Sequence, residues 1–181
     1  LFTLQKQLLA NDSAADDLLG HAVALDGDTA LIGAPYDDVM EQDQGSAYVF
    51  VRNGETWTQQ ARLVANDGAN LDLFGWAVAL DGDTALIGAY NGPGTASTDQ
   101  GAAYVFVRNG TVWTQQKRLN ASDGVMAGLY ATALAISGDT VQTGASVGVA
   151  ILDSHSEMRT ALEQVAREVQ PDPAGASAPS A

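Results

Sequence analysis

The 181-residue chain has no cysteine, few basic residues and no long apolar run. Without cysteine, neither disulfides nor thiol chemistry can contribute to fold or function. Eight lysine and arginine residues stand against 22 acidic ones, and the formal net charge is −14. This balance argues against a nucleic-acid partner, because phosphate backbones are bound by clustered Lys and Arg. No stretch approaches the roughly 18 consecutive apolar residues of a membrane-spanning helix. We therefore expect a protein with no nucleic-acid partner and no membrane span.

The sequence opens at Leu1, not Met, and its first residues do not show the basic and then apolar pattern of a secretory leader. We therefore expect a mature or excised piece of a protein.

What the sequence does have is internal repetition. Residues 20–34 (GHAVALDGDTALIGA) and 75–89 (GWAVALDGDTALIGA) differ at one position, and so do residues 44–54 and 100–110. A degraded third copy begins near Tyr130. Self-similarity at such a period indicates a repeat architecture.

Each copy carries two hairpin signals. In the first copy, Asp26-Gly27 separates residues 22–25 from 29–34, and Asn53-Gly54 separates residues 46–52 from 56–64. Such pairs supply the positive φ that tight hairpin turns demand. Two successive hairpins predict a four-stranded antiparallel meander. The inner strands are apolar on both faces, which predicts that further sheets cover each side, as in the stacked blades of a propeller.

The sequence therefore predicts an all-β fold, a β-propeller-type array of four-stranded antiparallel blades with about three repeats. Propellers have 4 to 8 blades, so we expect further repeats or self-association to complete the ring. The N-terminal strand is also a candidate to complete the third blade. The expected segments are β-propeller repeats over 1–152 (outer strand 1–10, blade 20–64, blade 75–120, degraded blade 131–152), an amphipathic helix at 155–169 and a disordered Pro/Ala/Ser tail at 170–181.

Two motifs in these repeats carry a resemblance to a known family. Phe74-Gly75 and Gly33-Ala34-Pro35 resemble the FG-GAP repeat of integrin α-subunit propellers, and the fuller order of blocks is similar to the bacterial branch. The resemblance implies a non-enzymatic recognition or adhesion module of a secreted or cell-surface protein, with a bacterial envelope as the expected location. Such a module binds a protein or glycan through inter-blade loops. A structural spacer within a larger envelope protein is the alternative.

The resemblance also raises the question of calcium. The calcium loop of integrin propellers has shrunk here to Asp26-Gly27-Asp28, which is too short to supply six to eight oxygen ligands. The acidic inter-blade links leave two interpretations open, calcium binding or Asx-turns that cap their own backbone. The candidate ligands in these links are Asp12, Asp16, Asp67, Asn70 and Asp72.

Candidate ligand-binding residues lie where the copies differ. The loops at 36–43 and 91–99 are the most divergent, and binding residues are concentrated on loops. Aromatic residues that recur in both copies, such as Trp57 and Trp113, are expected to pack within blades. The candidates for ligand contact are Trp76, Tyr36, Asp37, Asp38 and Asn91.

One catalytic motif is present and rejected. Residues 144–148 (GASVG) match the G-x-S-x-G nucleophile elbow. The in-register copies at Gly33 and Gly88 lack the serine, however, and His155 lies beyond the repeats with no convergent partner. We expect no enzyme activity.

Overall fold

The computed structural model describes residues 6–92, 101–120, 131–137 and 140–144. Every regular element in this part of the chain is a β-strand. None of the described residues forms a helix long and apolar enough to cross a membrane. The strands are β1 (Val23–Asp26), β2 (Thr29–Ala34), β3 (Ser46–Asn53), β4 (Thr56–Leu63), β5 (Phe74–Asp81), β6 (Thr84–Ala89), β7 (Ala102–Asn109), β8 (Val112–Leu119), β9 (Ala133–Ser137) and β10 (Thr140–Gly144).

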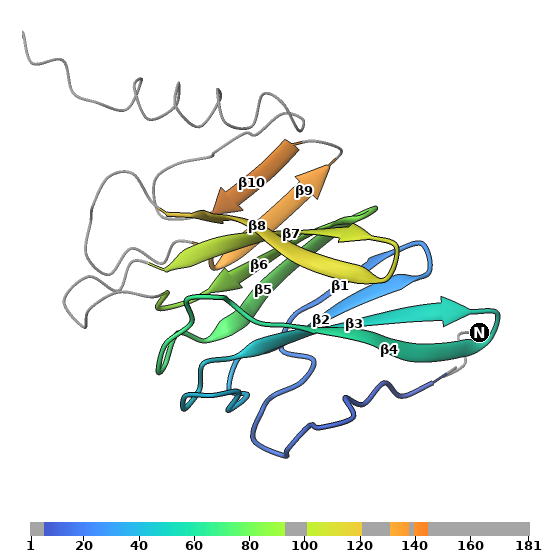
Figure 1. Cartoon of the computed structure of the whole chain (residues 1–181), viewed down its shortest axis with the longest axis horizontal. Helices are drawn as coiled ribbons and strands as arrows, with labels where there is room; N and C mark the ends of the chain where they lie inside the picture. Colours follow the sequence, from blue (N-terminus) through green and yellow to red (C-terminus); the bar gives the residue numbers. More distant parts are fainter. Residues whose placement is uncertain (1–5, 93–100, 121–130, 138–139, 145–181) are drawn as a thin grey trace, which may run out of the picture.

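The strands form two four-stranded sheets and one hairpin. Strands β1 to β4 make blade 1 and strands β5 to β8 make blade 2, each an antiparallel meander in sequence order. Strands β9 and β10 pair as a third antiparallel unit. The three units are stacked, with blade 2 between blade 1 and the β9–β10 hairpin (Figure 1). The all-β, propeller-type prediction is confirmed in this part of the chain.

The hairpin turns form at the predicted glycines. Asp26 and Thr29 are register partners around Gly27, which has a φ of 52°, and Asn53 and Thr56 are partners around Gly54, with a φ of 61°. These positive values are the conformation that glycine adopts without steric cost. Both blades also contain a register shift at the same place in their third strand, between Val49 and Phe50 in blade 1. The second blade is thus a structural copy of the first.

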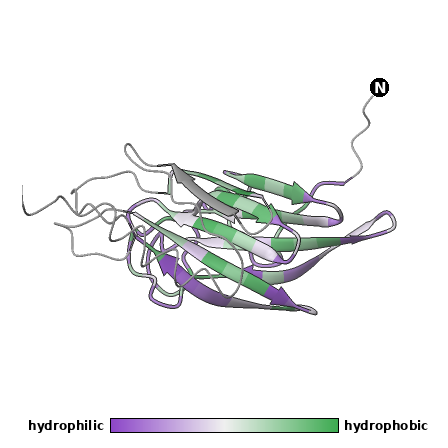
Figure 2. Ribbon diagram, turned by 90° about the horizontal axis from the view of Figure 1, so that it is seen from above, coloured by the Kyte–Doolittle hydropathy of each residue, from purple (hydrophilic) through white to green (hydrophobic). Residues whose placement is uncertain are grey.

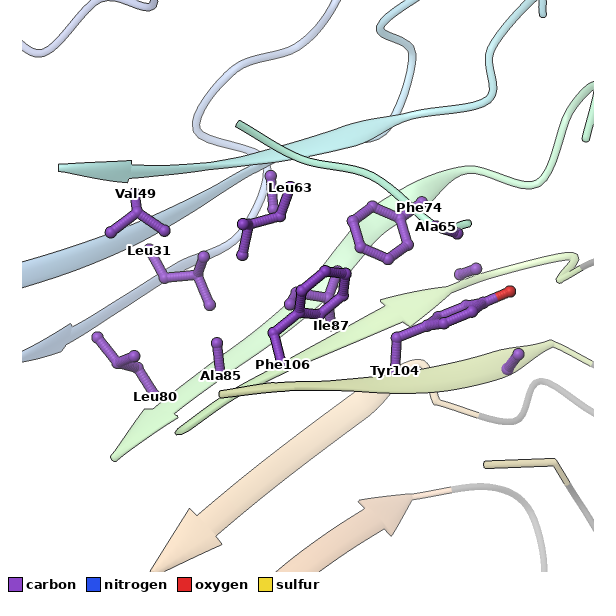
Figure 3. Close-up of a cluster of buried hydrophobic side chains, with 13 residues drawn as sticks. Leu31, Val49, Leu63, Ala65, Phe74, Leu80, Ala85, Ile87, Tyr104 and Phe106 are labelled. Carbon is purple, nitrogen blue, oxygen red and sulfur yellow. The ribbon is translucent and has the colours of Figure 1, made fainter. Parts of the chain in front are cut away.

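The main hydrophobic core lies between the two blades. Blade 1 contributes Leu31, Val49 and Leu63, and blade 2 contributes larger side chains on the facing sheet. Figure 3 shows these side chains pointing toward one another from the two sheets. The aromatic members come from blade 2, where Phe74 packs edge-on against Tyr104 and Phe106. Burial of this apolar surface is the main force that holds one blade on the next.

Two further clusters cover the outer faces of this pair. Leu134 and Ile136 of β9 pack on the far side of blade 2. On the far side of blade 1, Leu8, Ala10 and Leu19 of the N-terminal segment pack against β2 and β3. Hydrophobic residues accordingly run along the strand interiors, and hydrophilic ones gather toward turns and strand ends (Figure 2).

Strand β1 departs from the prediction that the inner strands are buried on both faces. Strand β2 is buried throughout, as expected, but Val23 and Leu25 of β1 are 62% and 65% exposed. Strand β1 belongs to the first unit of the stack, so no sheet among the described residues covers this side of it.

The FG and GAP motifs meet across the blade junction. A Cβ atom on Gly33 would overlap the carbonyl oxygen of Gly75, and one on Gly75 would overlap that of Ser46. Gly88 stands in the same relation to Ala131 at the next junction. Glycine is needed here because the backbone of one repeat runs directly over the inner strand of the preceding one.

Several expectations fall wholly or partly outside the described residues. These are the helix at 155–169, the tail at 170–181, the catalytic motif around Ser146, part of the degraded blade at 131–152 and most of the loop at 91–99. Residues 6–10, the described part of the expected outer strand, are in no strand. Because residues 1–5 are not among the described residues, the outer strand at 1–10 stays a prediction.

Candidate functional site

The connections between inner and outer strands all lie at one end of the blades. This loop end comprises residues 11–22, 35–45, 65–73 and 90–92, whereas the tight hairpin turns lie at the opposite end (Figure 1). The described loop-end residues include nine Asp or Glu and no Lys or Arg. Two arginines on neighbouring outer strands, Arg62 and Arg118, reach carboxylates of this end. The loop end is consequently the acidic face of an acidic molecule.

A row of three aromatic rings lies across the loop end. Trp76 stands between His21 and Tyr90, with ring centroids 4.5 Å and 4.6 Å away. His21 is exposed, and Trp76 and Tyr90 are half-buried. The row joins the two blades, since His21 precedes β1 while Trp76 and Tyr90 belong to the second repeat. Partly exposed aromatic rings of this kind offer a large, rigid contact area to a ligand.

The same backbone turn positions the first two rings. The amide of His21 donates to the carbonyl of Leu18, and the amide of Trp76 donates to the carbonyl of Leu73. Leu18 and Leu73 have φ values of 53° and 55°, a left-handed conformation uncommon for residues with a side chain. Because both repeats keep this turn, the two rings occupy equivalent positions on adjacent blades.

Asp37 is the centre of a buried polar network in blade 1. Its carboxylate accepts hydrogen bonds from Ser46 Oγ and from Tyr48 Oη, the latter at 2.8 Å, and it pairs with the Arg62 guanidinium at 2.6 Å. Burial, assisted by the bond to Asp37, raises the pKa of Tyr48. Arg62 also pairs with Asp12 at 2.9 Å. The network ties the loop after β2 to the outer strand, so Asp37 acts from inside the blade and not on its surface.

Blade 2 lacks part of this network. Ala102 stands where blade 1 has Ser46. Gly92 stands where blade 1 has Asp37, because each lies two residues after the aligned pair Pro35 and Tyr90. Tyr104 is fully buried, and within the described ranges its hydroxyl has no hydrogen-bond partner. Burial, with a smaller contribution from the negative charge of Asp67, raises the pKa of Tyr104.

The other predicted ligand residues have local bonds. The amide of Tyr36 donates to the carbonyl of Asp17, and Asn91 makes the matching bond to Asp72. The Asn91 side chain also donates to the carbonyl of Leu71 at 2.6 Å. Both residues thereby fasten a loop to an inter-blade link. Asp38 is exposed and accepts a bond from the amide of Asp43 at 2.7 Å.

The five candidate calcium ligands lie on two successive inter-blade links, Asp12 and Asp16 on the first and Asp67, Asn70 and Asp72 on the second. Asp12 pairs with Arg62, and Asp67 pairs with Arg118 at 2.6 Å. Asp72 is buried and caps its own link, because its carboxylate accepts from the amide of Ala69. Asp16 and Asn70 are exposed on the links. Over the described residues, no three carboxylate, histidine or cysteine side chains are grouped as metal ligands.

Of the predicted ligand residues, Trp76 alone lies in the aromatic row. Sequence reasoning gave no ligand role to the other two rings, His21 and Tyr90. A signal for both was present, because each stands at a position where the repeats differ: His21 is the counterpart of Trp76, and Tyr90 replaces Pro35. The recurring tyrosines and phenylalanines of β3 and β7 are buried in the blades, whereas the recurring Trp57 and Trp113 are half-buried beside arginines at the hairpin end. At the loop end, the partly exposed rings are the ones that differ between the copies.

Comparison with known proteins agrees with this architecture. The family model of the FG-GAP repeat matches residues 2–50 and 57–106. A search of curated proteins found no significant match. The two matched segments together contain all of β1, β2, β5 and β6, most of β3, β4 and β7, and all three rings of the aromatic row.

Proposed function

Because the chain belongs to the FG-GAP repeat family, we propose that it is a non-enzymatic recognition module that binds a protein or glycan through its loop end. FG-GAP repeats are typical of adhesion or recognition modules, are generally non-catalytic, and are common in extracellular and cell-surface proteins. We accordingly propose a secreted or surface location, with a bacterial envelope as the expected setting.

The aromatic row carries the proposal. His21, Trp76 and Tyr90 differ between repeats, contact one another and keep part of their surface in solvent. A position needed only for blade packing would be expected to recur, as Tyr48 and Tyr104 do. Partly exposed aromatic rings are frequent anchors in recognition surfaces.

Charge narrows the ligand class. The described loop-end residues carry no Lys or Arg, and the chain has a formal net charge of −14. Like charges brought together at an interface are unfavourable. The ligand is therefore a neutral glycan or a neutral to basic protein surface, and sulfated or otherwise anionic glycans are disfavoured.

The test is a binding screen of neutral and sulfated glycans and of basic and acidic proteins, followed by titration of the hits. Trp76→Ala should weaken binding about tenfold or more, since loss of an aromatic anchor costs roughly 1–2 kcal/mol or more. Trp57→Ala is the matched control, because Trp57 is equally half-buried but lies at the opposite end, beside Arg52.

A structural spacer is the second candidate function, favoured by the open ends of the blade stack. It predicts that no ligand class binds above background. Binding that Trp76→Ala and Trp57→Ala weaken equally would reject the loop end as the binding surface.

A further inference from the structure

The junction between blades 1 and 2 shows which side chains of one blade cover the apolar face of the inner strand of the next blade. Val78 and Leu80 of β5 pack into the core between the blades, where Leu80 is 9% exposed. Their cover comes from the inner strands of blade 1, chiefly Ala24 of β1 and Leu31 of β2. The outer strand of blade 1 adds Leu63, and Ala65 follows it.

On the free face of blade 1, the described residues provide only the outer part of such a cover. Leu8 and Ala10 stand one repeat before Leu63 and Ala65, and they pack on blade 1. The amide of Asn11 donates to Gln59 Oε1 at 2.9 Å, as the amide of Asn66 does to Gln115 one repeat later. The N-terminal segment therefore occupies the place of the outermost strand of a preceding blade.

The inner part of that cover is absent from the described structure. Val23 and Leu25, the counterparts of Val78 and Leu80, are 62% and 65% exposed. Two large apolar side chains are thus left in solvent on an inner strand, at positions that are packed in the next repeat. The missing complement is a pair of inner strands with a small-residue face like that of Ala24.

The other end of the stack presents such a pair. Strand β9 covers blade 2 with Leu134 and Ile136, while Ala133 and Ala135 on its opposite face are exposed. Ala135 is the repeat counterpart of Ala24. The β9–β10 hairpin consists of a first and a second strand, and no described strand pairs with it as a third or fourth. Among the described residues, one end of the stack thus holds the first two strands of a blade, and the other end holds a segment in the place of the fourth.

We propose that two copies of this chain associate head to tail, with the β9–β10 hairpin of each copy covering Val23 and Leu25 of the other. One shared blade then has inner strands from one copy and an outermost segment from its partner. The three described units of one copy and those of its partner together make six blades, within the 4 to 8 that propellers have. The same contact occurs twice in such a dimer, which closes it.

The first test is the solution mass of the 181-residue chain by sedimentation and light scattering over a dilution series. We expect a species of twice the 18.7 kDa of one chain. Val23→Glu should weaken this dimer about tenfold or more, because it places a charge against apolar surface. Val112→Glu is the control, because Val112 is 63% exposed, as Val23 is, but lies on the outer strand β8.

The second test uses the absence of native cysteine. Oxidation of a mixture of Leu25→Cys and Ala135→Cys chains should give a crosslinked pair, whereas neither variant alone should crosslink. Both positions are exposed in the single chain, so each variant is expected to fold. A monomer at every concentration, a larger assembly, equal effects of the two glutamate variants, or a crosslink within one chain carrying both cysteines would overturn the proposal.

Discussion

Tyr48 and Tyr104 occupy the same position in two nearly identical blades but have different polar surroundings. Tyr48 donates to Asp37, whereas the Tyr104 hydroxyl has no hydrogen-bond partner among residues the structure describes. A hydrogen bond to a charged group contributes about 1.5–3 kcal/mol, and a buried hydroxyl without a partner costs free energy. Two identical side chains should therefore respond oppositely to loss of the hydroxyl.

Tyr48→Phe should lower the free energy of unfolding by about 2 kcal/mol, and Tyr104→Phe should leave it within about 0.5 kcal/mol or raise it. Urea unfolding at neutral pH measures both. An equal loss in the two variants would contradict the difference between the networks.

The same pair predicts a pH dependence. Burial raises the pKa of both tyrosines, so the folded state holds these protons more tightly than the unfolded state. Their contribution to stability is complete below the ordinary tyrosine pKa of about 10 and is lost as the pH rises above it. Each Phe variant should therefore lose less stability in alkaline solution than the parent chain. Parallel stability curves for parent and variants above pH 10 would argue against this linkage.

At the scale of strands and junctions, the glycine of the GAP motif is a steric requirement. Gly33→Ala places a Cβ against the Gly75 carbonyl, so the two blades must separate or shift. We expect a loss of about 3 kcal/mol or more, in the range of severe overpacking. Gly54→Ala is the control, because Gly54 has a positive φ but open space around it, and its cost is about 1–2 kcal/mol. Thermal or urea unfolding measures both, and equal losses would mean that the junction is not closely packed.

Strand positions were largely predictable from the sequence, because short turn motifs within each repeat determine them. The Asp-Gly and Asn-Gly turns fixed the hairpins, so that β2 has its predicted bounds, β3 and β4 differ from theirs by one residue at one end, and β1 is shifted by one residue at both ends. The exposure of Val23 and Leu25 was not predictable, because it depends on which unit stands next to β1 and not on the strand itself. The aromatic row was predicted only at Trp76, since contacts between rings in different repeats depend on how the blades stack.

At the scale of the whole molecule, the large negative net charge is expected to influence stability. The net charge of −14 is spread over a chain in which the described arginines are already engaged, Arg52 with Asp28 and Arg108 with Asp83 among them. Self-repulsion of this kind weakens when salt screens it. Calcium at specific sites would instead act at low concentration, by binding the folded state.

A melting experiment separates the two effects. Because Asp12 and Asp67 are paired with arginines, we expect calcium or a chelator to change the melting temperature by no more than about 1 °C at constant ionic strength. Added sodium chloride should raise it by several degrees, on the order expected for screening of a strongly charged domain. A large stabilisation by calcium but not by magnesium would show a metal site and contradict this prediction.

The near-identity of residues 20–34 and 75–89 has a consequence for folding. During refolding, an inner hairpin of one repeat fits the outer hairpin of the other almost as well as its own. Such exchanges bury similar apolar surface but join the wrong segments, and misassembly of this kind is characteristic of repeat proteins. The residues that differ between the copies, with Trp76 and Tyr90 among them, therefore also favour correct pairing of segments within each repeat over exchange between repeats.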